Sequence, residues 1–199
     1  MSCEIRRTKF NVIILGDSQV GKSSMIANLR GIKFDEDGLS TTGIDFFNDT
    51  ATFDGKKYTF KIFDTAGQER FKSISTKQIK LGDGFMIVYS VDLPTAFIQT
   101  KWWIDTIDEE TDITKKPVLL VANKIDLERK VTQKEGYELA STRNIKYIET
   151  SAKTGFNIKE AFNELYTEIY NVKKDDIKAT EENIKIKKLS KKKNSKAFC

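Results

Sequence analysis

The chain has 199 residues, of which 39% are hydrophobic and 32% charged, a balance that suits one globular domain and argues against global disorder. The formal net charge of +5 is unevenly placed, because residues 172–199 hold ten Lys against four acidic residues, which leaves the rest of the chain near −1. A near-neutral body is not typical of a nucleic-acid-binding domain, so we expect no nucleic-acid partner. The chain has no His, which excludes an imidazole base and His-ligated metals.

The two ends of the chain and its apolar runs indicate the cellular compartment that we expect for the protein. Cys3 and Cys199 lie too near the termini to form a disulfide framework, so a reducing compartment is expected. The N-terminus lacks the apolar region of a secretory signal, and no apolar run reaches the ~18–20 residues of a membrane span.

Strand patterns alternate with helix patterns along the chain. We expect strands at about 9–16, 44–53, 58–63, 85–89, 118–122 and 147–150, and helices at about 21–30, 95–109, 133–142 and 156–170. Asp54-Gly55 predicts a hairpin turn. This alternation predicts a doubly wound α/β sheet, which binds ligands at the carboxyl ends of its strands. From about Val172 the Lys-rich, aromatic-poor sequence predicts a flexible arm.

A phosphate-binding pattern follows the first expected strand. Residues 16–23, G-D-S-Q-V-G-K-S, fit G-x-x-x-x-G-K-[ST] and open a helix. Backbone N–H groups of such a loop and the helix N-terminus hold phosphates, so we expect Lys22 to reach the β- and γ-phosphates and the Ser23 hydroxyl to bind Mg²⁺. The alternative, a glycine-rich turn with an incidental Lys, is disfavoured by the strand and helix on either side.

Two segments at later strand ends indicate a guanine base. In N-K-I-D, residues 123–126, the Asp126 carboxylate would accept hydrogen bonds from the guanine N1–H and exocyclic amine, a donor pair that adenine lacks. In T-S-A-K, residues 150–153, the Ala152 N–H would meet guanine O6 and the Lys153 stem would cover the base. N-K-x-D also occurs in ordinary loops, and its place after an apolar strand favours the nucleotide site.

The segment D-T-A-G-Q, residues 64–68, follows the third expected strand. We expect Asp64 to hold Mg²⁺ through water and the Gly67 N–H to approach the γ-phosphate. Gln68 is a neutral donor and acceptor, suited to orienting a water and not to strong base catalysis, so it is the expected catalytic residue. Taken alone, Gln68 would be interpreted as a solvated loop amide.

These segments, in this order and spacing, resemble the Ras superfamily of small GTPases over about residues 9–171. S-T-T-G-I-D-F at 40–46 resembles the switch I of the Rab family, and R-F-K-S-I at 70–74 resembles its switch II. The resemblance implies one P-loop GTPase domain with a mostly parallel six-stranded sheet and helices on both faces. A flexible N-terminus (1–8) would precede it, and a Lys-rich hypervariable tail (172–199) would follow.

The resemblance also assigns roles to two further residues. It implies that Thr41 binds Mg²⁺ and the γ-phosphate, and that Phe34 packs edge-on against the base; without it, Phe34 would be interpreted as a core aromatic. The expected Mg²⁺ ligands are Ser23, Thr41 and Asp64. The full set of expected nucleotide contacts is Ser18, Gln19, Val20, Gly21, Lys22, Ser23, Ser24, Phe34, Thr41, Asp64, Gly67, Asn123, Lys124, Asp126, Ser151, Ala152 and Lys153.

Four residues at three sites depart from the Rab pattern. Phe63 stands where Rabs usually carry Trp, and Gln78-Ile79 replaces a Tyr pair, which alters the expected effector surface. Gln19 replaces Gly at a loop position that we expect to need φ > 0, where a side chain costs roughly 1–2 kcal/mol.

Seven Lys between 185 and 196 precede Cys199. One interpretation is a solvated basic linker with an incidental cysteine. The family resemblance favours prenylation of Cys199, although the end is not C-a-a-X and lacks the two cysteines usual in Rabs. One prenyl chain binds membranes marginally, and the Lys run would add about 1 kcal/mol per Lys near an anionic surface.

The resemblance implies a molecular switch in vesicular membrane traffic, in which GTP and Mg²⁺ order switch I (about 34–46) and switch II (about 64–79) and hydrolysis releases them. No arginine finger in cis is evident, so slow intrinsic hydrolysis and a GTPase-activating protein are expected. Other implied partners are an exchange factor, effectors, and a dissociation inhibitor or escort protein. The implied location is the cytoplasmic face of an intracellular membrane, cycling with the cytosol. Two alternatives stay open: a nucleotide-bound interaction module that barely turns over, and a nucleic-acid binder that acts through the tail.

Overall fold

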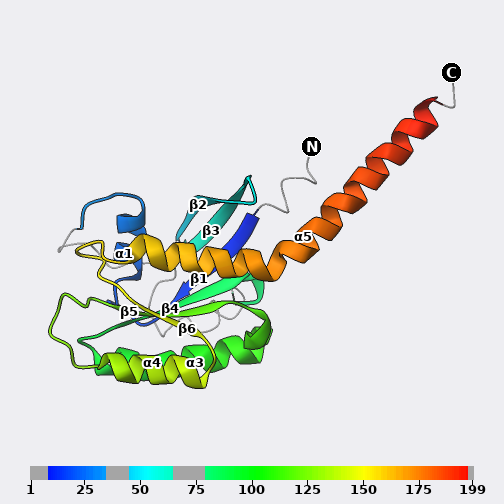
Figure 1. Ribbon diagram of the computed structural model, residues 1–199. Coiled ribbons are helices and arrows are strands. Elements are labelled where there is room, and N and C mark those ends of the chain that lie inside the picture. Colours follow the sequence, from blue (N-terminus) through cyan, green and yellow to red (C-terminus); the bar gives the residue numbers. More distant parts are fainter. Residues whose placement is uncertain (1–8, 35–44, 65–78, 197–199) are drawn as a thin grey trace.

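The computed structural model describes residues 9–34, 45–64 and 79–196, with side chains up to residue 179 except that of Asp45. Its strands form one sheet in the order β2-β3-β1-β4-β5-β6 (Figure 1). Only the β2–β3 pair is antiparallel among these six strands, which confirms the expected mostly parallel sheet. The strands are β1 Lys9–Leu15, β2 Asp45–Phe53, β3 Lys56–Asp64, β4 Gly84–Ser90, β5 Val118–Asn123 and β6 Lys146–Glu149.

Helices cover both faces of the sheet, as the sequence predicts. Helices α1 (Lys22–Leu29) and α5 (Ile158–Lys196) lie on one face, and α3 (Pro94–Thr111) and α4 (Gln133–Thr142) on the other (Figure 1). A short 3₁₀ turn, η3 (Ile113–Lys115), leads from α3 to β5. The sheet's central strands are buried on both faces, and all seven residues of β4 are buried, which explains their near-continuous apolar sequences.

The turn between β2 and β3 is the expected two-residue hairpin. Phe53 pairs with Lys56 across it. Asp54 and Gly55 have φ of 48° and 73°, and two successive positive φ angles match the right-handed twist of the strands.

Helix α5 is longer than the sequence predicts. The expected end near residue 170 is wrong, because the helix continues to Lys196. No Gly or Pro follows Gly155, so nothing in the sequence breaks the helix once its apolar face ends. Ile177 is still buried, and Lys173 Nζ lies 3.5 Å from Asp83 Oδ1. Beyond this contact the helix extends away from the domain (Figure 1), and the flexibility of this segment stays a prediction.

Within the part of the chain that the structure describes, none of the helices has both the length and the apolar composition that crossing a bilayer requires.

Candidate functional site

Four described segments converge at the carboxyl edge of the sheet. They are the loop after β1 (residues 16–21), Asp64 at the end of β3, the loop after β5 (residues 124–132) and the loop after β6 (residues 150–157). Parallel strands bring these chain-distant segments to one edge, where doubly wound sheets bind ligands.

The loop after β1 passes so close to its neighbours that two positions require glycine. Gly16 has φ 141°, and a Cβ there would lie 2.1 Å from the Val88 carbonyl oxygen. Gly21 has φ 96°, and a Cβ there would lie 2.4 Å from Asn123 Nδ2. The first and sixth residues of the G-x-x-x-x-G-K-S pattern are therefore fixed by backbone shape.

Lys22 begins α1 and turns back into this loop. Its side chain is buried, and Nζ donates to the carbonyl oxygens of Gly16 at 2.8 Å and Asp17 at 2.6 Å. Burial lowers the pKa of Lys22 to about 8, although the carboxylates of Asp64 and Asp17 act in the opposite direction. A phosphate in the loop would supply the negative charge that stabilises this buried ammonium group.

Ser23 and Asp64, two of the expected Mg²⁺ ligands, are in direct contact. Ser23 Oγ donates to Asp64 Oδ2 at 2.6 Å, and Asp64 is buried at the end of β3. Hydroxyl and carboxylate oxygens are hard donors that suit Mg²⁺, which typically completes its coordination with water and substrate phosphates. These two residues fit a magnesium site. Thr41, the third expected ligand, lies outside the described residues.

Asn123, the last residue of β5, ties together the loops after β1 and β6. Its side chain is fully buried, and Nδ2 donates to the Val20 carbonyl oxygen at 2.8 Å. Its Oδ1 accepts from Thr150 Oγ1 at 3.2 Å and from the Ala152 N–H at 3.1 Å. The Ala152 N–H, which we expected at guanine O6, thus donates to Asn123 here, and its contact with O6 stays a prediction.

Asp126 is exposed on the loop after β5, and a buried serine orients it. Ser151 Oγ donates to Asp126 Oδ1 at 2.5 Å, while the Thr154 N–H donates to Ser151 Oγ at 3.1 Å. Lys124 has φ 62°, and its Cε lies 4.0 Å from the position of a Cβ on Gly21, so its stem covers the loop after β1. The N-K-I-D and T-S-A-K motifs are therefore in direct contact.

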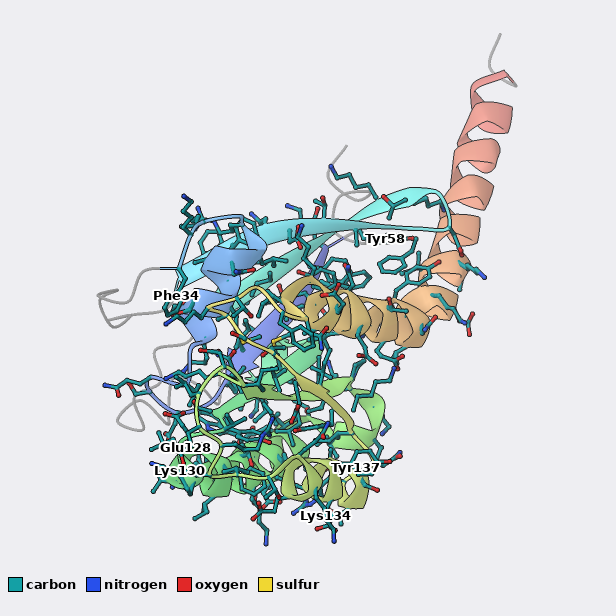
Figure 2. All side chains as sticks on the ribbon, turned by 60° about the vertical axis from the view of Figure 1, so that its left-hand side comes forward. Phe34, Tyr58, Glu128, Lys130, Lys134 and Tyr137 are labelled. Carbon is teal, nitrogen blue, oxygen red and sulfur yellow. The ribbon has the colours of Figure 1, made fainter. Side chains whose placement is uncertain are left out.

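The structure places the other described candidates around this edge. Gln19 is exposed with φ 63°, which confirms that its position needs a positive φ. Val20 is buried, Ser18 and Ser24 are partly buried, and Lys153 is exposed. Phe34 follows α1 and is 39% exposed (Figure 2), so it is not a core aromatic. Gly67, Gln68 and Cys199 lie outside the described residues.

Two further contacts at this edge involve residues that lie outside every sequence motif. Asn28 Nδ2 on α1 donates to the Ala152 carbonyl oxygen at 3.2 Å, and Arg129 Nη1 lies 2.9 Å from Glu149 Oε1. Partners so far apart in a single sequence give no local signal of their contact.

A strand that enters a glycine loop and a helix, with a buried Lys inside the loop and a Ser–Asp pair beside it, defines a P-loop nucleotide-binding domain. The comparison with protein-family models agrees, since the model of the Ras family matches residues 11–171. The chain therefore belongs to the Ras family and is a Rab-like small GTPase.

Three similar proteins illustrate how much of the chain such matches cover. Ras-related protein Rab-8B of Pongo abelii is 39% identical over 155 residues, which cover 77% of this chain and 74% of that protein. Ras-related protein RABA5c of Arabidopsis thaliana is 34% identical over 164 residues, 81% of this chain and 76% of that protein. The Ras and EF-hand domain-containing protein homolog of Caenorhabditis elegans is 34% identical over 86% of this chain, but the match spans only 27% of that longer relative.

Proposed function

We propose that this protein binds GTP and GDP with Mg²⁺, hydrolyses GTP slowly and acts as a switch between its two nucleotide states. The observation that carries the proposal is the contact between Asp126 and Ser151 at 2.5 Å, beside a P-loop with a buried Lys22. This arrangement holds a carboxylate at a fixed point near the phosphate loop, and a guanine base would offer it two donors.

Each described residue has a defined task in this proposal. Lys22 and the backbone N–H groups of residues 18–23 would bind the β- and γ-phosphates, and Asp126 would select the base. Mg²⁺ at Ser23 and Asp64 would supply positive charge to the phosphate oxygens. The expected role of Gln68, orienting the attacking water, comes from its place after Asp64 in the sequence.

A second candidate is a nucleotide-bound module that barely hydrolyses GTP, and the strained φ of Gln19 is the observation in its favour. A single-turnover assay on protein loaded with GTP and Mg²⁺ separates the two. The switch proposal predicts slow but complete conversion to GDP, accelerated by a GTPase-activating protein. GTP that stays intact over many hours with such a protein present would favour the second candidate.

The variant Gln68→Leu tests the catalytic assignment in the same assay. We expect GTP to bind with the wild-type affinity, because Leu removes no phosphate contact, while hydrolysis is lost because no side chain orients the water. Calorimetry with a non-hydrolysable GTP analogue supplies the binding control. Hydrolysis at the wild-type rate with normal binding would show that Gln68 does not have this role.

We also propose a role in vesicular membrane traffic, on the cytoplasmic face of an intracellular membrane. The support is the Rab-like sequence together with the Lys-rich segment that α5 carries beyond the domain. An exchange factor, effectors and an escort or dissociation-inhibitor protein are the corresponding partners. Partners retained by the GTP-bound Gln68→Leu variant and not by GDP-bound protein would identify the transport step.

A further inference from the structure

The loop between β5 and α4, residues 124–132, carries Asp126 and contains neither strand nor helix. The backbone holds it near both ends. The Ile125 N–H donates to the Thr150 carbonyl oxygen at 3.2 Å, and the N–H groups of Lys130 and Val131 donate to the Val91 carbonyl oxygen at 2.8 and 2.9 Å. Between these anchors the loop turns outward, and Figure 2 shows Glu128 and Lys130 on it where it leads into α4.

Arg129 connects the outer part of this loop to the end of β6. Its Nη1 lies 2.9 Å from Glu149 Oε1, and the two side chains are only 31% and 17% exposed. The Tyr147 hydroxyl donates to the same carboxylate oxygen at 2.8 Å. A tyrosine hydroxyl is protonated at neutral pH and can donate, and burial raises the pKa of Tyr147 further.

Glu149 is in turn held by a packed part of the fold. Tyr147 lies beside the fully buried Tyr89 of β4, and a Cβ on Gly136 of α4 would lie 2.4 Å from Tyr89 Oη and 2.9 Å from Tyr147 Oη. The two tyrosine hydroxyls therefore occupy the space beside α4 that a side chain at Gly136 would fill. Arg129 therefore pairs with a carboxylate whose position is set by β4, β6 and α4 together.

We propose that Arg129, acting through Glu149, is a positioning residue for guanine recognition. This inference rests on the proposed function. Ser151 orients one oxygen of Asp126 from the side of β6, and Arg129 anchors the chain three residues further along to the same strand. An exposed ion pair adds little stability, but a partly buried one with a second donor, as between Arg129 and Glu149, fixes geometry. The Asp126 carboxylate must be placed accurately to select a base.

The test compares GDP with inosine diphosphate, whose base lacks the exocyclic amine that Asp126 would bind. The ratio of their dissociation constants measures that one contact, and general damage to the protein weakens both nucleotides alike. We expect Arg129→Gln to reduce the wild-type preference for GDP by about threefold to tenfold, in the range of coupling between groups in contact. Glu149→Gln should behave similarly, and Arg129→Lys, which can keep one contact to Glu149, should retain most of the preference.

Arg143→Gln is the matched control. Arg143 is also 31% exposed and pairs at 2.7 Å with Asp105, between α4 and α3 and away from the Asp126 loop, so its loss should leave the GDP preference unchanged. An unchanged preference in both Arg129→Gln and Glu149→Gln, with a clear preference in the wild type, would overturn the inference. A wild type that binds both nucleotides equally would overturn the guanine site itself, and the inference with it.

Discussion

Gln19 stands at a P-loop position whose left-handed backbone conformation favours glycine. With φ 63° it occupies the left-handed region, which costs a residue with a Cβ roughly 1–2 kcal/mol. The side chain is exposed, so no packing compensates for this cost. Strain at Gln19 weakens nucleotide binding only if the loop is less strained when it is empty than when it holds nucleotide. The release rate of GDP reports this difference in strain between the two states.

We expect Gln19→Gly to slow GDP release about fivefold, which corresponds to a relief of about 1 kcal/mol in the bound loop. Release of a fluorescent GDP analogue in Mg²⁺ measures the rate. Asn144→Gly is the matched control, because Asn144 also has a positive φ, 52°, but it follows α4 and is not part of the P-loop. Unchanged or faster release from Gln19→Gly would show that the loop accommodates Gln without cost to nucleotide binding.

Several site residues could be predicted because a local motif constrains each one. One short pattern between a strand and a helix predicts the two glycines of the P-loop, Lys22 and Ser23. The positive φ of Gln19 was expected from the resemblance to the Rab family. The buried bonds of Asn123 could not be predicted, since they join the end of β5 to the loops after β1 and β6. Such contacts depend on the order of strands in the sheet, which a single sequence does not encode locally.

At the scale of elements, strand and helix positions agree closely with the sequence patterns. Helix α4 has the expected bounds, and its start carries a capping box in which Glu135 N–H donates to Thr132 Oγ1 and Thr132 N–H donates to Glu135 Oε2. The expected end of α5 near residue 170 is wrong because a Lys-rich composition predicts the absence of a core and does not by itself predict the end of a helix.

The Lys-rich end of helix α5 and Cys199 are the basis of a prediction about membrane association. We expect reversible membrane association through Cys199 and the Lys run acting together, because a single prenyl chain is marginal and a basic patch alone is screened over ~10 Å at physiological salt. Two variants separate the contributions: Cys199→Ser, and Lys191, Lys192 and Lys193 all changed to Gln. Each should become largely cytosolic in fractionation, since three Lys contribute about 3 kcal/mol near an anionic surface.

Both tail variants should still bind GTP, which is the control for folding. High salt should release the wild-type protein more strongly than the Gln variant. If Cys199→Ser remains on membranes as fully as the wild type, lipidation at this residue is not the anchor, and membrane association would have to come from protein partners.

On the scale of the whole molecule, the tail and the nucleotide site lie at opposite edges of the sheet. Helix α5 begins just after the T-S-A-K loop at the carboxyl edge and runs back to Asp83, which precedes β4 at the amino edge. A membrane attached to the tail would therefore leave the nucleotide edge facing away, open to partners. The distribution of charge agrees with a tail that meets the membrane and a body that does not, because the excess of basic residues lies in residues 172–199 and the body is nearly neutral.

The central claim is that this edge of the sheet selects guanine nucleotides, and calorimetry tests it most directly. Nucleotide-free protein in Mg²⁺ should bind GTP and GDP tightly and show no measurable binding of ATP, because adenine leaves Asp126 without its two donors. Asp126→Asn should shift the preference toward xanthine nucleotides, whose C2 oxo group replaces the guanine amine. ATP affinity comparable to that of GTP in the wild-type protein would contradict the account.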